Sequence, residues 1–245
     1  MGVVDVSVVI PAYNEELRIP ATLAALTDRL PQRLGSFEVL VVDDGSDDAT
    51  VEVVSGHPDA RVRVLTQEQN LGKGAALRAG IGAARGDVVV LLDADLPVDV
   101  NQIADLVDAA AGADLVVGSR RLPGSSVDPP QPLVRRVGGG VFIRLVRVMG
   151  YGVTSDPQCG VKVLRAATVA PIAVSTSTDG FAFDAELIDR CRRNRLQVLD
   201  RPVAWRHVEG STLRPFRDVL RTLGELWRLR SDRPVAVAPA PRPVP

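Results

Sequence analysis

Two aspartates, Asp93 and Asp95, follow the most hydrophobic stretch of the chain and are separated only by Ala94. Carboxylates placed one residue apart at the end of a strand can point at one hard cation. Such a pair holds Mg²⁺ or Mn²⁺ while substrate phosphates and water fill the other coordination positions. The alternative is a solvated turn, because Asp is common where strands end.

Two other segments carry residues suited to binding a nucleoside or a phosphate. The sequence DDGS at residues 43–46 is either a plain turn, in which Asp44 holds the loop, or a site where Asp43 binds a donor group of a base or ribose. In NLGKG at residues 70–74, the glycines would let the backbone approach a ligand closely beside Lys73. This segment lacks the spacing of a phosphate-binding P-loop.

Short apolar strands alternate with helices over the first 120 residues or so, which predicts βαβ units. Strands are expected at residues 6–10, 37–42, 62–66, 87–92 and 114–119, and helices at residues 16–30, 47–55, 70–84 and 101–110. Continuous apolar strands fit a sheet that is covered on both faces. The predicted fold class is therefore α/β, with a mostly parallel central sheet and helices on both faces.

Ligands of such sheets bind beyond the carboxyl ends of the strands. Four polar clusters fall at these ends, namely residues 13–15, 43–44, 93–95 and 119–121. Their convergence on one edge of the sheet favours a functional site at Asp93 and Asp95 over an isolated turn.

The alternation stops after residue 121. A loop rich in Pro, Gly and Ser is expected at residues 122–132, an apolar segment with four arginines at 133–149, and helices at 181–193 and 213–230. We predict a main domain over residues 1–212, a basic amphipathic helix over 213–233 and a disordered Pro-rich tail over 234–245.

Composition excludes several classes of protein. The 245 residues are 46% hydrophobic and 24% charged, which excludes a wholly disordered chain. No apolar run approaches the ~20 residues of a membrane-spanning helix, and no secretory signal is recognisable. Two cysteines, Cys159 and Cys191, are too few for a disulfide scaffold or a four-cysteine zinc site. We expect both to be reduced and the protein to be cytoplasmic.

The net charge of −1 hides an asymmetry along the chain. Residues 1–189 carry a balance of −9, whereas residues 190–233 carry +7. A basic C-terminal third indicates an anionic partner such as phosphate or a membrane surface. Nucleic acid is not expected, because the basic segment has no interleaved aromatic surface.

Several motifs occur in an order that resembles family 2 glycosyltransferases. They are VVIPAYNE at residues 8–15, VVDDGS at 41–46, NLGKG at 70–74, DAD at 93–95 and GSR at 118–120. Three later motifs resemble the branch that glycosylates polyprenyl phosphates, namely DPQCGVK at 156–162, FAFDAE at 181–186 and VEGS at 208–211. The chain is most similar to dolichyl-phosphate β-glucosyltransferases, and next to dolichol-phosphate mannose synthases.

This resemblance implies a GT-A fold, a nucleotide-sugar donor and inversion at the anomeric carbon. It implies a metal at Asp93 and Asp95, with Asp95 and Arg120 at the reacting sugar. Arg120 would also contact the acceptor phosphate, with Arg135 and Arg136 beside it. The implied donor-binding residues are Pro11, Tyr13, Glu15, Asp43, Asp44, Lys73, Asp93, Ala94 and Arg206.

The sequence departs from the pattern of these relatives at three points. Pro97 stands where mannose synthases have a metal-binding Gln, so the cation is expected to have fewer protein ligands. Thr212 stands where a lysine is expected. The C-terminal transmembrane helices of many relatives have no counterpart here.

The nature of the acceptor decides whether a base is needed. A hydroxyl acceptor requires a general base, for which Asp184 is the candidate, although a carboxylate there also suits the start of a helix. A phosphomonoester is already anionic at pH 7 and needs only to be positioned, a task for which arginine is well suited.

The predicted helix over residues 213–230 has an apolar stripe that includes Trp227, with arginines elsewhere. Such a helix lies in a membrane interface, covers the sheet or joins two copies in a homodimer. We expect peripheral, salt-sensitive association with the anionic inner face of the plasma membrane.

The sequence thus predicts transfer of a hexose, glucose from UDP-glucose, to a polyprenyl phosphate with Mg²⁺ or Mn²⁺. The alternatives are the same reaction with GDP-mannose, a soluble transferase acting on a sugar, polyol or protein hydroxyl, and a nucleotide-sugar-binding regulator.

Overall fold

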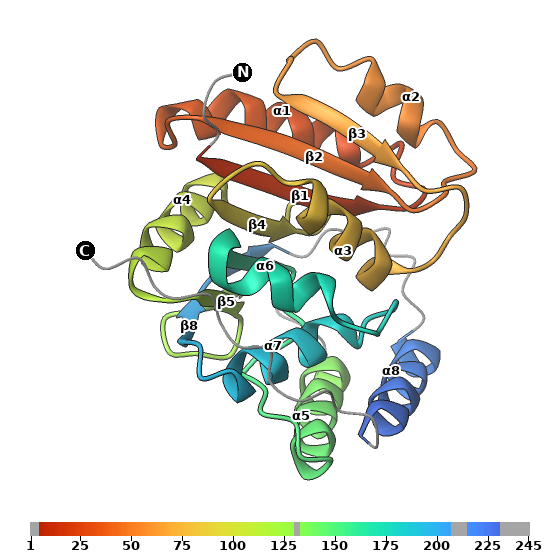
Figure 1. Ribbon diagram of the computed structural model, residues 1–245, viewed down its shortest axis with the longest axis vertical. Coiled ribbons are helices and arrows are strands. Elements are labelled where there is room, and N and C mark those ends of the chain that lie inside the picture. Colours follow the sequence, from red (N-terminus) through yellow and green to blue (C-terminus); the bar gives the residue numbers. More distant parts are fainter. Residues whose placement is uncertain (1–4, 130–132, 207–214, 231–245) are drawn as a thin grey trace.

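A seven-stranded sheet in the order β3-β2-β1-β4-β7-β5-β8 forms the centre of the molecule (Figure 1). The computed structural model describes residues 5–129, 133–206 and 215–230, and the side chains of these residues except 133–137 and 215–218. The strands of the sheet are β1 (Val6–Ala12), β2 (Phe37–Asp43), β3 (Val62–Thr66), β4 (Val88–Leu92), β5 (Leu115–Ser119), β7 (Val161–Arg165) and β8 (Val198–Pro202). β7 runs antiparallel to β4 and β5, and the other neighbouring pairs are parallel. The predicted mostly parallel sheet is confirmed.

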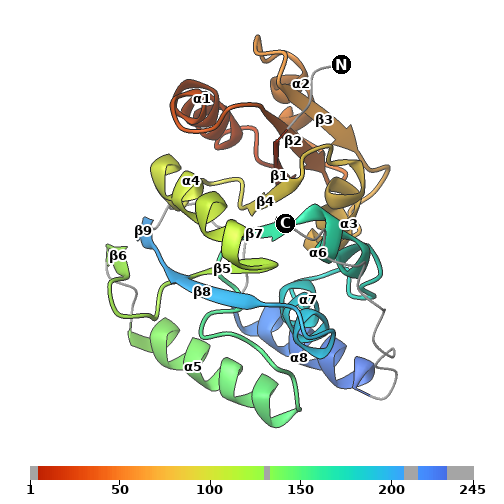
Figure 2. The same ribbon diagram turned by 60° about the vertical axis from the view of Figure 1, so that its left-hand side comes forward.

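Helices cover both faces of the sheet (Figure 2). They are α1 (Ile19–Arg29), α2 (Thr50–Ser55), α3 (Lys73–Ala83), α4 (Val100–Ala109), α5 (Leu133–Val148), α6 (Ala166–Val174), α7 (Phe183–Arg193) and α8 (Pro215–Leu229), with 3-10 turns at Leu30–Gln32 and Ala110–Gly112. Two short strands, β6 (Ser126–Asp128) and β9 (Ala204–Arg206), pair with each other beside the main sheet.

Alternate residues of the central strands pack into two separate cores. In β1, Val8 and Ile10 pack with α1, α2 and α4, whereas Val9 packs with α3, α6 and α7. Successive side chains of a strand point to opposite faces, so a strand buried on both sides is apolar at most of its positions. This explains the continuous apolar runs of the sequence.

The sequence did not identify β7, β8 and α6. In β7 the apolar run is interrupted by Lys162, which a helix or loop could carry equally well. Lys162 is nevertheless buried, because an ion pair with Asp184 satisfies its charge. An ion pair between distant segments leaves no local pattern in the sequence.

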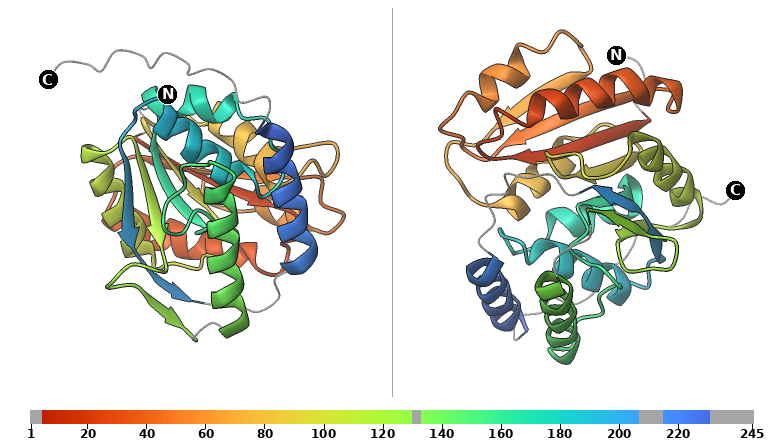
Figure 3. Two further views of the ribbon diagram at one scale, coloured as in Figure 1. Left: turned by 90° about the horizontal axis from the view of Figure 1, so that it is seen from below. Right: turned by 180° about the vertical axis from the view of Figure 1, so that it is seen from behind.

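A third apolar cluster joins α5, α7 and α8. It contains Phe142, Ile143 and Val146 of α5, Ala185 of α7 and Leu226 of α8, all buried. The two views of Figure 3 show α5 and α8 side by side at one end of the molecule. Within the described ranges, none of the helices has both the length and the apolar content needed to cross a bilayer.

Both cysteines are free, as expected, and both are buried. Burial raises the pKa of Cys159 and of Cys191 to about 12, so neither thiol is ionised at neutral pH.

Glu38 of β2 is a buried carboxylate that ties together the strands at the amino-terminal end of the sheet. It accepts hydrogen bonds from Ser7 Oγ (2.7 Å), Arg63 Nε (2.8 Å) and the backbone amide of Arg85 (2.9 Å). Burial alone would raise the pKa of Glu38, but these donors hold it below its ordinary value. The fold therefore favours the ionised form of this carboxyl.

We expect Glu38→Gln to lower the free energy of unfolding by about 1–3 kcal/mol at pH 7. An acid with a lowered pKa contributes stability above its unfolded pKa, near ~4.3 for Glu, and loses it as the pH falls. The difference between wild type and variant should therefore shrink in urea denaturation at about pH 3.5. The exposed Glu52→Gln serves as the control, and an equal loss at both pH values would contradict the argument.

Candidate active site

A pocket of about 340 Å³ lies at the carboxyl ends of β1, β2 and β4. In Figure 1 the arrowheads of β1 and β2 point to the side of the molecule on which α8 lies. The pocket is lined by the loops after these strands, the start of α3, the loop before α7, and α8. Its lining residues are Pro11, Ala12, Tyr13, Glu15, Arg18, Asp44, Asn70, Gly72, Lys73, Asp93, Ala94, Asp95, Gly180, Phe181 and Arg221. Three of the four polar clusters predicted from the sequence therefore meet in this pocket.

Hydrogen bonds between the loops after β1 and β2 present Tyr13 and Glu15 to the pocket. The amide of Asn14 donates to Ser46 Oγ (2.9 Å), and the amide of Asp47 donates to Asn14 Oδ1 (2.9 Å). Asn14 has a φ of +55°, a left-handed conformation that Asn adopts more readily than most residues. This explains why an Asn separates the two lining side chains.

The two aspartates at the end of β2 have different positions. Asp44 lines the pocket and accepts from the amides of Leu71 (2.9 Å) and Gly72 (2.8 Å), so it also holds the glycine-rich loop. Burial raises the pKa of Asp44 against the effect of these bonds. Asp43 is buried behind the lining, where it accepts from the amide of Ser46 (3.2 Å). Its contact with a nucleotide stays a prediction.

The turn at Asp93-Ala94-Asp95 is fixed by contacts from outside it. The hydroxyl of Thr22 donates to the Ala94 carbonyl (2.6 Å), and the amide of Asp93 donates to the Gly160 carbonyl (3.0 Å). The carboxylate of Asp93 lies directly against Gly160, where a Cβ atom would be 2.5 Å from its Cγ. Gly160 therefore leaves the space that Asp93 occupies.

Two ion pairs lie in the lining of the pocket. Nζ of Lys73 lies 2.6 Å from Oδ1 of Asp93, and Arg18 donates twice to Glu15 (2.6 and 2.5 Å). Burial would lower the pKa of Lys73, but the carboxylates of Asp93, Asp184 and Asp95 raise it. Lys73 is thus a permanent cation at the edge of the aspartate pair.

The donor set suits a divalent cation. Burial and the negative charge of the neighbouring Asp93 raise the pKa of Asp95. The surrounding groups therefore balance the charge of this carboxylate only in part. Carboxylate oxygens are the ligands that Mg²⁺ and Mn²⁺ prefer. In the described part of the chain, no group of three or more His, Cys, Asp or Glu side chains is arranged so that it could hold a metal ion by itself. That Asp93 and Asp95 hold the ion together with substrate and water stays a prediction.

Arg120 lies outside the pocket lining, at the end of β5. Its Nε and Nη2 donate to Asp156 (2.7 and 2.8 Å), and its guanidinium stacks over Trp205 at 4.7 Å. This ion pair occupies one edge of the guanidinium, formed by Nε and Nη2. Contact of Arg120 with the reacting sugar stays a prediction. Arg206 is exposed, and its amide donates to the Pro97 carbonyl (2.7 Å). The side chains of Arg135 and Arg136 lie outside the described ones.

Asp184, the candidate base for a hydroxyl acceptor, is also outside the lining. Its Oδ1 lies 2.7 Å from Nζ of Lys162, and both side chains are almost fully buried. Nζ of Lys162 also donates to the Cys159 carbonyl (2.7 Å). Asp184 thus balances a buried charge, which was not foreseen from the sequence.

We expect Asp184→Asn to lower the free energy of unfolding by about 3 kcal/mol, because it leaves the Lys162 ammonium buried without a counter-charge. Adding Lys162→Met should restore most of this loss, since the double variant has no buried charge to satisfy. Chemical denaturation of the two single variants and the double variant measures the coupling. Additive losses would show that the pair contributes nothing to stability.

Several lining residues were not predicted as site residues, among them Arg18, Gly180, Phe181 and Arg221. The loop that carries Gly180 is held by Glu186, which accepts from the amides of Ser177 and Thr178 (both 3.0 Å). The Asp179 carbonyl in the same loop accepts from the amide of Gly74 (2.6 Å), which brings Phe181 beside Lys73. The FAFDAE motif could have indicated Phe181, but no local signal distinguishes Arg18 or Arg221.

Comparison with known proteins gives a match to Glycosyl transferase family 2 over residues 7–165. The chain belongs to this family. It is therefore a glycosyltransferase. A dolichyl-phosphate beta-glucosyltransferase from Dictyostelium discoideum is 30% identical to it, over 91% of this chain and 73% of the relative.

Solved structures of this glycosyltransferase's neighbours show its GT-A fold. A glucosyl-3-phosphoglycerate synthase from Mycobacterium tuberculosis in complex with UDP has a TM-score of 0.65 and 24% identity, over 91% of this chain and 80% of that one. The same enzyme in complex with Mn²⁺ and UDP-glucose has a TM-score of 0.64 and 21% identity, over 94% and 80%. The predicted GT-A architecture is confirmed.

Proposed function

We propose that this glycosyltransferase transfers glucose from UDP-glucose to a polyprenyl phosphate, with inversion and with Mg²⁺ or Mn²⁺ at Asp93 and Asp95. The name of the Dictyostelium discoideum relative supports the sugar and the lipid acceptor. The bound UDP-glucose and Mn²⁺ of the M. tuberculosis neighbour support the donor and the metal. The single observation that carries the proposal is the pair Asp93 and Asp95 beside Lys73 in one pocket.

Breaking the bond between a sugar and a diphosphate places negative charge on the departing nucleotide. A divalent cation bound by Asp93 and Asp95 would neutralise part of that charge. Lys73 adds a permanent positive charge at the same edge of the pocket. Tyr13 and Glu15 lie in the same pocket, on loops that hydrogen bonds hold in place, and are proposed to contact the nucleotide.

The acceptor proposal fits the environment of Asp184. A phosphomonoester has a second pKa near ~6 and attacks as an anion, so it needs no general base. The buried ion pair of Asp184 with Lys162 fits a structural carboxylate rather than an exposed base. Arg120, Arg135 and Arg136 remain the proposed ligands of the acceptor phosphate.

The proposed membrane contact is the outer surface of α5 and α8. Val141, Leu145 and Val148 of α5 are 43–76% exposed, and Leu220 and Trp227 of α8 are about 60% exposed. The neighbouring Arg144, Arg147 and Arg230 are exposed as well. Apolar side chains beside arginines suit an anionic lipid surface, and α8 also reaches the pocket. We therefore propose a peripheral protein of the inner face of the plasma membrane.

A sedimentation assay with vesicles tests this contact. We expect binding to vesicles that contain anionic lipid, loss of binding at high salt, and at least a several-fold loss in Trp227→Ala. Val174→Ala is the control, because Val174 is an exposed apolar residue of α6 and belongs to neither helix. Equal binding of the wild type, Trp227→Ala and Val174→Ala would contradict a membrane face at α8. If the wild type is a dimer in solution and Trp227→Ala is a monomer, this face is instead the contact with a second copy.

The function is tested by transfer of radiolabelled sugar into a lipid that extracts into organic solvent. Purified protein receives UDP-glucose or GDP-mannose, Mg²⁺ or Mn²⁺, and a short polyprenyl phosphate. We expect metal-dependent label in the organic phase from UDP-glucose. Label from GDP-mannose alone would show that GDP-mannose is the donor. Donor binding without any labelled lipid would exclude the polyprenyl acceptor.

A further inference from the structure

One cation of the pocket comes from α8, a helix that the sequence indicated only for membrane, sheet or dimer contact. Arg221 of α8 lines the pocket together with Gly180, Phe181 and Lys73. We propose that Arg221 binds a phosphate group of the substrate in this pocket, which makes α8 part of the active site. This inference rests on the function proposed above.

The other lining cations are already paired inside the pocket. Arg18 donates to Glu15, and Lys73 lies 2.6 Å from Asp93, so both balance carboxylates of the same lining. The side chains of Arg18 and Lys73 are no more than 19% exposed. Their positive charge is therefore largely compensated before a substrate arrives.

Arg221 differs in its exposure and in its partner. Its side chain is 67% exposed, and Nε lies 3.0 Å from Oε1 of Glu225, which is not in the lining. Among the described residues, its terminal nitrogens Nη1 and Nη2 have no hydrogen-bond acceptor. A guanidinium that has these two donors available can bind two phosphate oxygens at once.

The position of Arg221 is fixed by the packing of its helix. The hydroxyl of Tyr151 donates to the Leu226 carbonyl (2.8 Å), and the Leu226 side chain is completely buried. The Glu225 carboxylate lies against Gly180, where a Cβ atom would be 3.0 Å from Oε2. α8 is thus held against the loop that lines the pocket, so Arg221 needs no large movement to reach a ligand.

Two phosphates could be the ligand of Arg221, the diphosphate of the donor and the phosphomonoester of the acceptor. Both present the same oxygen chemistry to a guanidinium. Lys73, Asp93 and Asp95 share the pocket with Arg221, and these are the residues proposed to face the departing diphosphate. We therefore expect the donor diphosphate to be the ligand.

Calorimetric titration of UDP, UMP and uridine into the full chain, without acceptor, tests whether Arg221 binds the donor diphosphate. We expect Arg221→Ala to weaken UDP binding about ten-fold and to leave uridine binding unchanged. Arg221→Lys should be intermediate, because an ammonium lacks the planar fork. Arg228→Ala is the matched control, since Arg228 is exposed on the same helix but is not in the lining. Melting temperatures show that each variant is folded.

Steady-state kinetics test whether Arg221 instead binds the acceptor phosphate. A ten-fold rise in the KM for a short polyprenyl phosphate, with unchanged UDP binding, would support Arg221 as a ligand of the acceptor phosphate. The inference would be overturned if Arg221→Ala changed neither UDP binding nor the KM for the polyprenyl phosphate, or if Arg228→Ala had an equal effect. Failure of the wild-type protein to bind UDP would instead overturn the proposed function, so the two failures are distinguishable.

Discussion

Replacing Asp95 by Asn is expected to reduce the rate of sugar transfer about a thousand-fold or more and to make the metal-free protein more stable. The loss of activity follows because the variant has one fewer carboxylate to hold a cation beside the departing diphosphate, and a thousand-fold loss corresponds to about 4 kcal/mol of transition-state stabilisation. The gain in stability has a separate cause. The pKa of Asp95 is raised by burial and by Asp93, so the ionised form opposes folding wherever the pH lies above that pKa.

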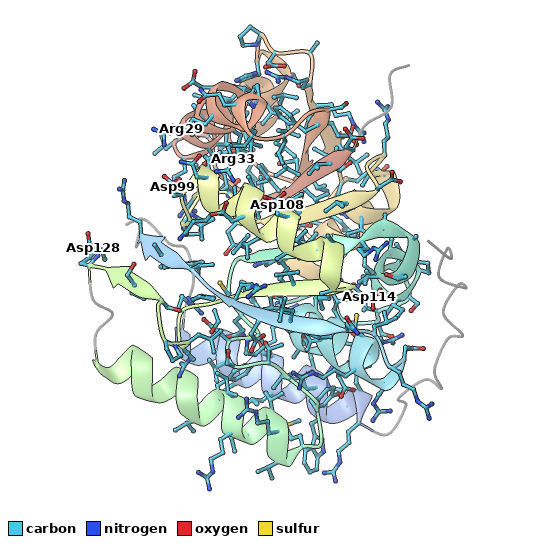
Figure 4. The ribbon with its side chains drawn as sticks, turned by 90° about the vertical axis from the view of Figure 1, so that its left-hand side faces the viewer. Arg29, Arg33, Asp99, Asp108, Asp114 and Asp128 are labelled. Carbon is cyan, nitrogen blue, oxygen red and sulfur yellow. The ribbon has the colours of Figure 1, made fainter. Side chains whose placement is uncertain are left out.

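Two measurements separate these effects. Activity is measured by label in the extracted lipid, and stability by thermal unfolding with and without Mn²⁺. A ligand that binds only the folded state raises the melting temperature, so Mn²⁺ should stabilise the wild type more than Asp95→Asn. Asp108→Asn is the control, because Asp108 is exposed on α4 (Figure 4). Full activity of Asp95→Asn would exclude this carboxylate from the reaction.

Gly160→Ala is expected to reduce activity at least a hundred-fold while the protein stays folded. A Cβ atom at residue 160 would lie 2.5 Å from Cγ of Asp93 and 3.1 Å from the ring of Trp205. The Asp93 carboxylate ends a short side chain that is partly exposed, so it can turn away and spare the surrounding fold. That movement would separate it from Lys73 and Asp95, and a small misplacement of a catalytic group is enough for a loss of this size.

Gly112→Ala provides a matched control, because nothing lies within 4 Å of a Cβ atom at residue 112. Activity and melting temperature are compared for the two variants. If Gly160 acts through Asp93, then adding Gly160→Ala to Asp93→Ala should cause no further loss of activity. A further loss of the same size in that background would show that Gly160 acts through another residue.

The strands that carry the pocket could be recognised because they are buried on both faces. In β1, β2 and β4 most positions are apolar, so the runs were visible in the sequence and their polar ends marked the candidate site. Asp93 and Asp95 were identified for this reason. The same rule failed for β7, where Lys162 is buried only because Asp184 lies 2.7 Å away.

Partners of the charged side chains could not be predicted. Arg120 and Asp184 were candidates because of their types and motifs, yet each is paired with a residue far along the chain, Asp156 and Lys162 respectively. Arg221 was considered only as part of a basic helix, because its distance from Asp93 in the sequence hides their meeting in one pocket.

The sequence alone determined the order of strands and helices in the first half, the edge of the sheet where the pocket lies and the aspartate pair that lines it. These features depend on local periodicity and on residues at strand ends, which are readable along the chain. The tertiary structure decided which cations face which carboxylates, the space that Gly160 leaves for Asp93 and the placement of α8 at the pocket. These depend on contacts between distant segments, whose distances and burial exist only once the chain has folded.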